Sequence, residues 1–205
     1  MSLYLIIAST MSFAETQPNQ YKVSTVVENL KFPWSITFLP NKDMLITERG
    51  GSLRVVRDGK LLEQKVSGLP DIYVEGPAGL FDVVLDPNFA VNQKLYISYS
   101  GGSASNNYVE VISATLQDMS LQQTKVIFTG SSRNTPHHHG ARMTFLPDNT
   151  LLITSGDGFN FRDQAQSLDS MLGKVLRINT DGSIPKDNPF IGQANVRPEI
   201  YTYGH

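Results

Sequence analysis

The feature that most constrains the fold is a hairpin pattern that occurs three times along the chain. Each copy is an apolar run, a turn of Pro followed by Asn or Asp, and a second apolar run. The copies span residues 36–47, 83–98 and 143–154, and the first and third are nearly identical. Short apolar runs bounded by Pro, Asn and Asp are typical of β-strands joined by tight turns. The repeat therefore predicts a chain built from similar β-hairpins.

The spacing of these hairpins favours a β-propeller. The turn prolines Pro40, Pro87 and Pro147 are unevenly spaced, but their intervals are near the ~40–50 residues of one propeller blade. A β-sandwich would also contain many short strands, yet it gives no reason for a sequence to repeat at blade spacing. Further strand candidates lie at residues 53–57, 61–66, 108–116 and 125–129. We therefore predict an all-β fold, a β-propeller of four-stranded blades with about three blades in this chain. Helical patterns are weak, and residues 163–172 show a short one.

Composition argues against several classes of protein. The 205 residues carry a net charge of −2 and contain no basic run, which argues against nucleic-acid binding. No apolar run approaches the ~20 residues of a membrane-spanning helix. Cysteine is absent, so neither disulfides nor cysteine-ligated zinc can form.

The N-terminus has features of a secretory signal. Residues 3–8 are apolar, Ala14 is a small residue at a suitable cleavage position, and a polar stretch with a proline follows. This order predicts a signal peptide at residues 1–14, although its basic start is missing. The alternative is a first β-strand of the domain. We expect a periplasmic or secreted protein in which residues 15–29 lead into the folded part.

The most distinctive motif is LGKVLRINTDGSIPKDNPF at residues 172–190. In residues 174–179, apolar and polar side chains alternate as in a half-buried strand. An Asp-Gly pair at 181–182 then predicts a tight turn, and two prolines predict an ordered loop beyond it.

This motif closely resembles the signature of the soluble quinoprotein sugar dehydrogenases, the PQQ-dependent glucose and aldose dehydrogenases. Members of that family are six-bladed propellers. The resemblance implies that residues 30–205 form a partial propeller, about its first half. Three blades cannot close a ring, so we expect the isolated chain to be marginally stable or aggregation-prone. We also expect it to be inactive, because half of the cofactor site that the resemblance implies is absent. The similarity runs through segments 33–40, 45–51, 79–83, 86–89, 95–99 and 138–157.

Three adjacent histidines, His137, His138 and His139, stand in a polar loop after Pro136. Three interpretations are open: a solvated loop, a metal site or a general base. A metal site is considered because imidazole binds Zn, Cu and Ni. Three neighbours on one loop cannot all face one ion, so a metal site would need ligands from elsewhere. The resemblance favours the general base, because His138 aligns with the catalytic base of the family.

The resemblance also assigns roles to residues around this base. Asp157 aligns with an acidic residue near the cofactor and could orient His138, although its Gly-rich surroundings also suit a simple turn. Arg162 aligns with an Arg that could face an anionic cofactor, and a solvated loop Arg is the alternative. Pro77 occupies the position of a Gln that contacts the quinone, and Pro offers no side-chain donor or acceptor. His137 replaces an Asp of the glucose-oxidising members.

Other residues carry weaker expectations. Arg142 is expected to be a solvated charge or a structural residue near the site, and Trp34 is expected to pack in the core. The acidic residues at 181–188 lack the spacing of an EF-hand. The resemblance implies calcium as a second cofactor beside PQQ, with the main ligands of both lying beyond His205. No metal site is predicted within this chain.

We therefore predict an oxidoreductase that oxidises the anomeric carbon of aldose sugars to lactones, with PQQ as hydride acceptor and His138 as general base. An external electron acceptor would reoxidise the cofactor. The alternative is a noncatalytic β-propeller that binds carbohydrate or protein, because fold does not determine function. Pro77 and His137 are the residues that favour this alternative.

Overall fold

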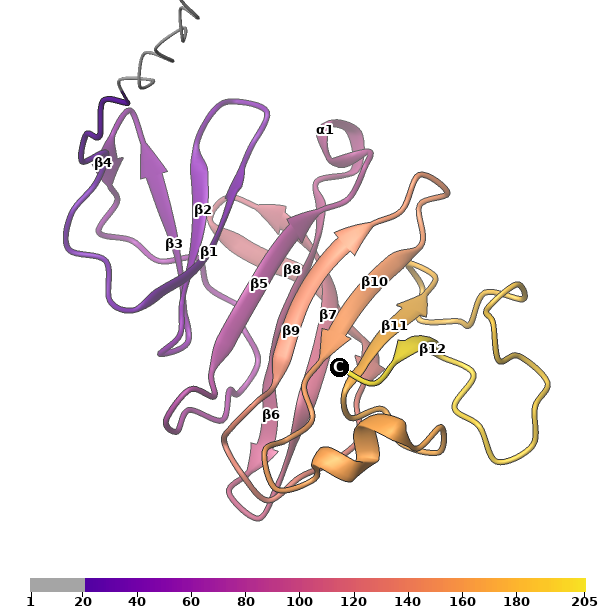
Figure 1. Cartoon of the computed structure of the whole chain (residues 1–205). Coiled ribbons are helices and arrows are strands. Elements are labelled where there is room, and N and C mark those ends of the chain that lie inside the picture. The colour runs from indigo at the N-terminus through magenta and orange to yellow at the C-terminus, as the bar shows by residue number, and fades with distance from the viewer. Residues whose placement is uncertain (1–20) are drawn as a thin grey trace, which may run out of the picture.

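A computed structural model describes residues 21–205 (Figure 1). The predicted signal segment at 1–14 lies outside the described residues. Within residues 21–205 the chain forms three four-stranded antiparallel sheets, which confirms the all-β prediction. None of the helices in this described part is long and apolar enough to cross a membrane.

The first sheet confirms the predicted hairpin and most of what was expected after it. Its strands pair in chain order and are β1 (Pro33–Phe38), β2 (Met44–Glu48), β3 (Ser52–Arg57) and β4 (Lys60–Leu61). The predicted strand at 61–66 is wrong over most of its length. Its middle is polar and exposed, so the chain leaves the sheet and returns through a single bridge to β3.

The second sheet contains the longest strands of the described chain. They are β5 (Leu80–Leu85), β6 (Lys94–Ser103), β7 (Asn106–Gln117) and β8 (Ser120–Thr129), again paired in chain order. The turn after β5 contains a single helical turn, α1 (Phe89–Asn92), which the sequence analysis missed. Phe89 is buried against the core between the first two sheets, so this turn is fixed by packing as well as by its proline.

The third sheet is formed by residues 140–203. Its strands are β9 (Gly140–Phe145), β10 (Leu151–Ser155), β11 (Lys174–Ile178) and β12 (Ile200–Tyr203). The helical pattern at 163–172 gives only a short 3₁₀ helix, η1 (Arg162–Gln166). Lys174 fixes this helix, because its buried ammonium donates to the carbonyls of Gln164 and Ala165 at 2.7 and 3.0 Å.

The sequence predicted a half-buried strand at residues 174–179, but two of its polar side chains are buried. Lys174 is 1% exposed and Arg177 is 5% exposed. Burial lowers the pKa of Lys174 to about 8. The Arg177 guanidinium donates to Asp148 at 2.6 Å and to Asp187 at 3.0 Å, and so joins two turns. These polar side chains can be buried because each one donates hydrogen bonds to neighbouring loops. The distinctive motif is therefore a structural scaffold.

Apolar side chains fill the two spaces between neighbouring sheets. The core between the first and second sheets contains Leu45, Leu53, Val55, Leu80, Val83, Leu95 and Ile97. The core between the second and third contains Phe81, Tyr96, Val109, Met143, Ile153 and Leu176. Trp34 packs against this second core, with its ring centroid 5.5 Å from that of Phe81, but it is only partly buried, so the expected core position is met in part.

The first strand of each sheet contacts the first strand of the next, so β1, β5 and β9 lie side by side (Figure 1). Sheets that pack face to face with their first strands adjacent are arranged as propeller blades. The repeated hairpin thus corresponds to the two innermost strands of each blade.

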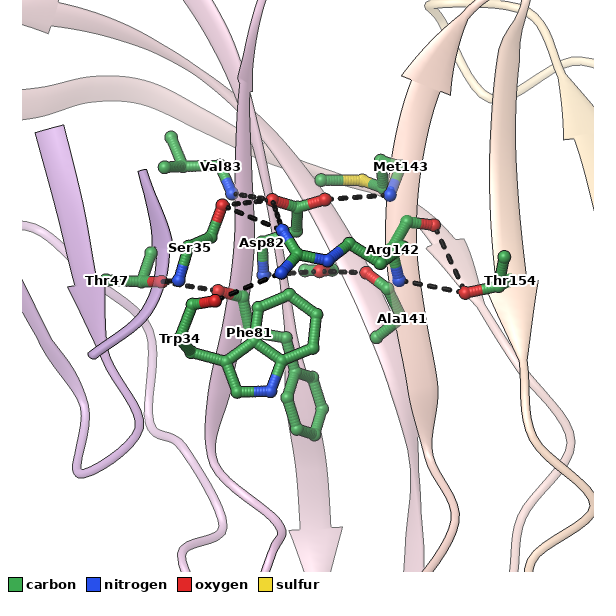
Figure 2. Close-up of polar contacts among 11 residues, drawn as sticks. Trp34, Ser35, Thr47, Phe81, Asp82, Val83, Ala141, Arg142, Met143 and Thr154 are labelled. Atoms are coloured by element: carbon green, nitrogen blue, oxygen red, sulfur yellow. Dashed lines mark hydrogen bonds and ion pairs between the residues drawn. The ribbon is translucent and has the colours of Figure 1, made fainter. Parts of the chain in front are cut away.

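A hydroxyl in the same repeat position joins the first blade to the second and the second to the third. In the first blade Thr47 accepts the N–H of Ser35 at 3.0 Å and donates to the carbonyl of Phe81, in the second blade, at 2.5 Å (Figure 2). The Thr47 side chain therefore satisfies backbone groups of two blades at once.

The second blade repeats this connection to the third. Ser98 accepts the N–H of Asp82 at 3.0 Å and donates to the carbonyl of Ala141 at 2.7 Å. In the third blade Thr154 accepts the N–H of Arg142 at 2.9 Å (Figure 2). The innermost strands are irregular at these points, and the hydroxyls bind the backbone groups that the strand pairing leaves free.

Asp82 is the centre of a polar cluster that reaches all three blades (Figure 2). Its buried carboxylate accepts the hydroxyl of Ser35 and the N–H of Met143, the latter at 2.8 Å. Arg142 reaches across it, at 3.3 Å from Asp82 and 3.1 Å from the carbonyl of Trp34. The Arg142 guanidinium also lies 4.2 Å from the Trp34 ring centroid. Arg142 is thus a structural residue, one of the two roles expected for it.

Candidate active site

His138 and Asp157 face each other across the loops that flank the two inner strands of the third blade. His138 precedes β9 and Asp157 follows β10, so the β9–β10 pairing brings the two loops together. The His138 Nδ1 atom lies 2.8 Å from the Asp157 Oδ1 atom. The side chain of His138 is 50% exposed, whereas that of Asp157 is 21% exposed. The pair is therefore open to a ligand from the imidazole side.

The ionisation of Asp157 follows from its surroundings. Burial acts to raise the pKa of Asp157, but the Phe159 N–H and His138 outweigh it, and the pKa is lower than usual. The ionised carboxylate accepts a hydrogen bond, so the Nδ1 atom of His138 carries the hydrogen. The Nε2 atom of a neutral His138 is then an acceptor that is free to take a proton.

The backbone of His138 is held in an uncommon conformation. Its φ is +54°, in the left-handed region. Arg133 is 2% exposed and donates from its Nη1 atom to the His138 carbonyl at 2.8 Å. Gly156 packs directly beneath, and a Cβ atom there would lie 2.1 Å from the His138 carbonyl oxygen. Only glycine at position 156 lets the two loops approach this closely.

Phe159 completes the surroundings of the pair. Its N–H donates to the Asp157 Oδ1 atom at 2.8 Å, the atom that also faces His138. Its ring stands nearly perpendicular to the His138 ring, with the centroids 5.2 Å apart. The Arg162 guanidinium lies 4.7 Å from the Phe159 ring centroid. The structure thus brings His138, Asp157 and Arg162 together around one phenyl ring.

Two of the three adjacent histidines contact the same ring, that of Phe159, and the third is buried beside Asn107. His137 packs against the ring of Phe159 at 5.6 Å. His139 is buried, with its Nε2 atom 3.1 Å from the Asn107 side-chain oxygen. Burial and the charge of Arg133 lower the pKa of His139 to about 3, so it is neutral at pH 7. Residues 21–205 contain no group of three or more metal-ligating side chains.

Pro77 is exposed in the loop before β5. This loop approaches the histidine loop, because a Cβ atom on Gly76 would lie 3.8 Å from Pro136. A shallow depression of about 410 Å³ lies beside the pair and is lined by Phe159, Asn160, Arg162 and Asp163. A larger apolar hollow of about 490 Å³ is lined by β1, β2 and the segment before them, and by no residue of the His138 loop.

Sequence reasoning missed the residues that hold this pair. Arg133 and Gly156 support the backbone of His138, and Phe159 supports Asp157. Two of them had a signal in the sequence: Gly156 and Phe159 stand immediately around Asp157 in a short Gly-rich segment. Nothing in the sequence distinguishes Arg133 from a solvated loop Arg.

Comparison with known proteins identifies the family. Residues 30–205 match the family described as Glucose / Sorbosone dehydrogenase. The chain belongs to this family. It is 38% identical to the aldose sugar dehydrogenase YliI of Escherichia coli over 91% of this chain and 52% of that protein. It is 28% identical to quinoprotein glucose dehydrogenase B of Acinetobacter calcoaceticus over 94% of this chain and 46% of that protein. The chain thus spans about half the length of these curated relatives.

Solved structures of the glucose/sorbosone dehydrogenase family share the fold. The apo form of the E. coli aldose sugar dehydrogenase matches with a TM-score of 0.83 and 38% identity, over 88% of this chain and 53% of that one. The PQQ-bound aldose sugar dehydrogenase of Streptomyces coelicolor matches with a TM-score of 0.75 and 27% identity, over 89% and 53%. The three sheets are therefore blades of a family propeller.

Proposed function

We propose that this chain is part of an enzyme that oxidises aldose sugars at the anomeric carbon with PQQ as cofactor. The observation that carries the proposal is the His138–Asp157 pair. The ionised carboxylate fixes the Nδ1 atom of a half-exposed imidazole and leaves its Nε2 atom free. Membership of a family with aldose and glucose dehydrogenases supports the choice of substrate class.

In this proposal His138 acts as general base. Its Nε2 atom takes the proton of the anomeric hydroxyl, while the hydrogen on the same carbon leaves as a hydride and a lactone forms. Bound PQQ supplies the quinone that accepts this hydride. Asp157 stabilises the imidazolium that results and keeps the ring oriented, as the carboxylate does in a catalytic triad. A general base of this kind contributes about 10²–10⁴-fold to the rate.

The residues present suit one contact to PQQ. PQQ is a planar tricarboxylate, so a site for it needs cations and flat apolar surfaces. Arg162 is an exposed cation over the Phe159 ring, which also packs against His138, and we propose that it faces a carboxylate of the cofactor. Pro77 offers no such contact, although its loop lies near the histidine loop.

Calcium remains a prediction from the family resemblance. The acidic side chains of the distinctive motif are already engaged, because Asp181 accepts from Ser183 and Asp187 pairs with Arg177. We therefore assign no calcium ligand among the described residues and no step to that ion. An external electron acceptor and a periplasmic or secreted location belong to the same proposal.

The test uses the complete gene product that carries this chain, supplied with PQQ and calcium. Sugar-dependent reduction of an artificial dye should occur with aldoses, and His138→Ala should lower the rate by about 10²–10⁴-fold. His137→Ala is the matched control, because it removes a neighbouring exposed imidazole. Equal rates in the wild type and His138→Ala would refute the assignment of the base.

A second candidate is a noncatalytic binding module. The observation that favours it is Pro77, which stands exposed near the histidine loop where the family resemblance expects a Gln that contacts the quinone. Titration of the complete protein with PQQ, followed by absorbance, distinguishes the two. Saturable binding supports the dehydrogenase, and an absence of binding supports the module.

A further inference from the structure

Phe159 has a backbone conformation that its side chain does not favour. Its φ is +60°, and it follows Gly158, whose φ is +70°. A left-handed conformation is unfavourable for a residue other than glycine. Such strain persists where the surrounding structure over-determines it, and it is common at functional sites. The contacts of Phe159 show what this conformation achieves.

The backbone of Phe159 acts on Asp157. Its N–H donates to Asp157 Oδ1 at 2.8 Å, and the same oxygen lies 2.8 Å from the Nδ1 atom of His138. The N–H therefore fixes the position of the oxygen that orients the imidazole. It also stabilises the ionised form of the carboxylate, which keeps the hydrogen of His138 on Nδ1.

The ring of Phe159 acts on His138 directly. The two rings are nearly perpendicular, at 86°, with centroids 5.2 Å apart, a preferred geometry for aromatic pairs. This contact limits rotation of a side chain that is otherwise half-exposed. Arg162 lies over the same phenyl ring, which restrains the phenyl ring in turn.

We infer that Phe159 is the positioning residue that holds His138 and Asp157 in register for proton transfer. This inference rests on the proposed function, since it assigns a residue to the same site. Phe159 contacts the imidazole and the carboxylate from one side, through its ring and its N–H respectively. The side chain of His138 remains 50% exposed beside it.

The test compares three variants of the complete protein loaded with PQQ. Phe159→Leu removes the aromatic ring, Phe159→Tyr retains it, and Phe161→Leu is the matched control in the same turn. NMR spectra of the histidine-labelled protein report the ring-current shift and the tautomer of His138, with His138→Gln giving the assignment. Phe159→Leu should abolish the ring-current shift and increase exchange between tautomers, while Phe159→Tyr and Phe161→Leu should preserve the wild-type signals.

Kinetics provide the second readout. In Phe159→Leu the kcat for aldose oxidation should fall about 10- to 100-fold with little change in KM, because the base is misplaced and not removed. Phe159→Tyr should restore it. An unchanged His138 spectrum in Phe159→Leu, or an unchanged kcat in an active enzyme, would overturn the inference. If the complete protein oxidises no aldose, the proposed function fails, and the spectra alone decide whether Phe159 holds the pair.

Discussion

The polar cluster around Asp82 predicts that one carboxylate stabilises the packing of three blades. The perturbation is Asp82→Ala, which removes the acceptor of two buried backbone amides, those of Val83 and Met143. It also removes the partner of the Ser35 hydroxyl and of Arg142. Both amides lose this acceptor in the variant.

The magnitude follows from burial. Each buried amide left without a partner costs about 1–3 kcal/mol, or about 2–6 kcal/mol for two. The Arg142 side chain is 58% exposed, so its ion pair adds at most about 1 kcal/mol. Removing a buried carboxylate relieves part of its desolvation cost. We therefore expect Asp82→Ala to lower the free energy of unfolding by about 2–5 kcal/mol. Asp82→Asn should cost less, because its carbonyl oxygen still accepts one of the amides.

The assay is urea unfolding of the complete protein, followed by circular dichroism. Arg142→Ala is the informative comparison, because it removes only the exposed member of the polar cluster. It should lower the free energy of unfolding by about 1 kcal/mol. The expected order of destabilisation is Asp82→Ala, then Asp82→Asn, then Arg142→Ala. A loss below about 0.5 kcal/mol in Asp82→Ala, within the usual effect of a surface substitution, would refute the reasoning.

Two further predictions concern the histidine loop. The pKa of His139 is near 3 in the folded protein and 6.5 in the unfolded chain. Between these two values the unfolded state binds more protons than the folded state. The free energy of unfolding should therefore fall by up to about 1.4 kcal/mol per pH unit as the pH drops below 6.5. His139→Gln should lower this slope between pH 6.5 and 5 in urea unfolding, whereas His137→Gln should retain it. At lower pH Asp43, Asp148 and Asp157, whose pKa values are also lowered, add slopes of the same sign. A slope between pH 6.5 and 5 that is unchanged in His139→Gln contradicts the assignment. Gly156→Ala places a methyl group against the His138 carbonyl and should cost about 1–3 kcal/mol and most of the activity. Gly50→Ala, where nothing lies within 4 Å, should be neutral in both assays, and equal effects of the two would argue against the clash.

The hairpin repeat predicted the inner strands of all three blades because alternation and turn chemistry act over a few residues. It also contained a signal that the sequence analysis did not interpret. The second strand of each hairpin ends in a hydroxyl residue at the same place: Thr47, Ser98 and Thr154. The structure explains this regularity through the bonds that these hydroxyls make to the innermost strands.

The outer parts of the blades were harder to predict, because tertiary partners decide them. Lys174 and Arg177 were polar positions of a strand that was expected to be half-buried, yet carbonyls and carboxylates of other segments allow both to be buried. The same reason applies at the site. The resemblance indicated His138 and Asp157, but the support from Arg133 depends on a contact that only the folded loops create.

The most direct test of the proposed base is a single-turnover experiment. The complete protein, loaded with PQQ, is mixed rapidly with an aldose, and the absorbance of the cofactor is followed for the wild type, His138→Ala and Asp157→Asn. We predict that reduction slows by about 10²–10⁴-fold in His138→Ala and by a smaller factor in Asp157→Asn. Reduction at the wild-type rate in His138→Ala would contradict the account.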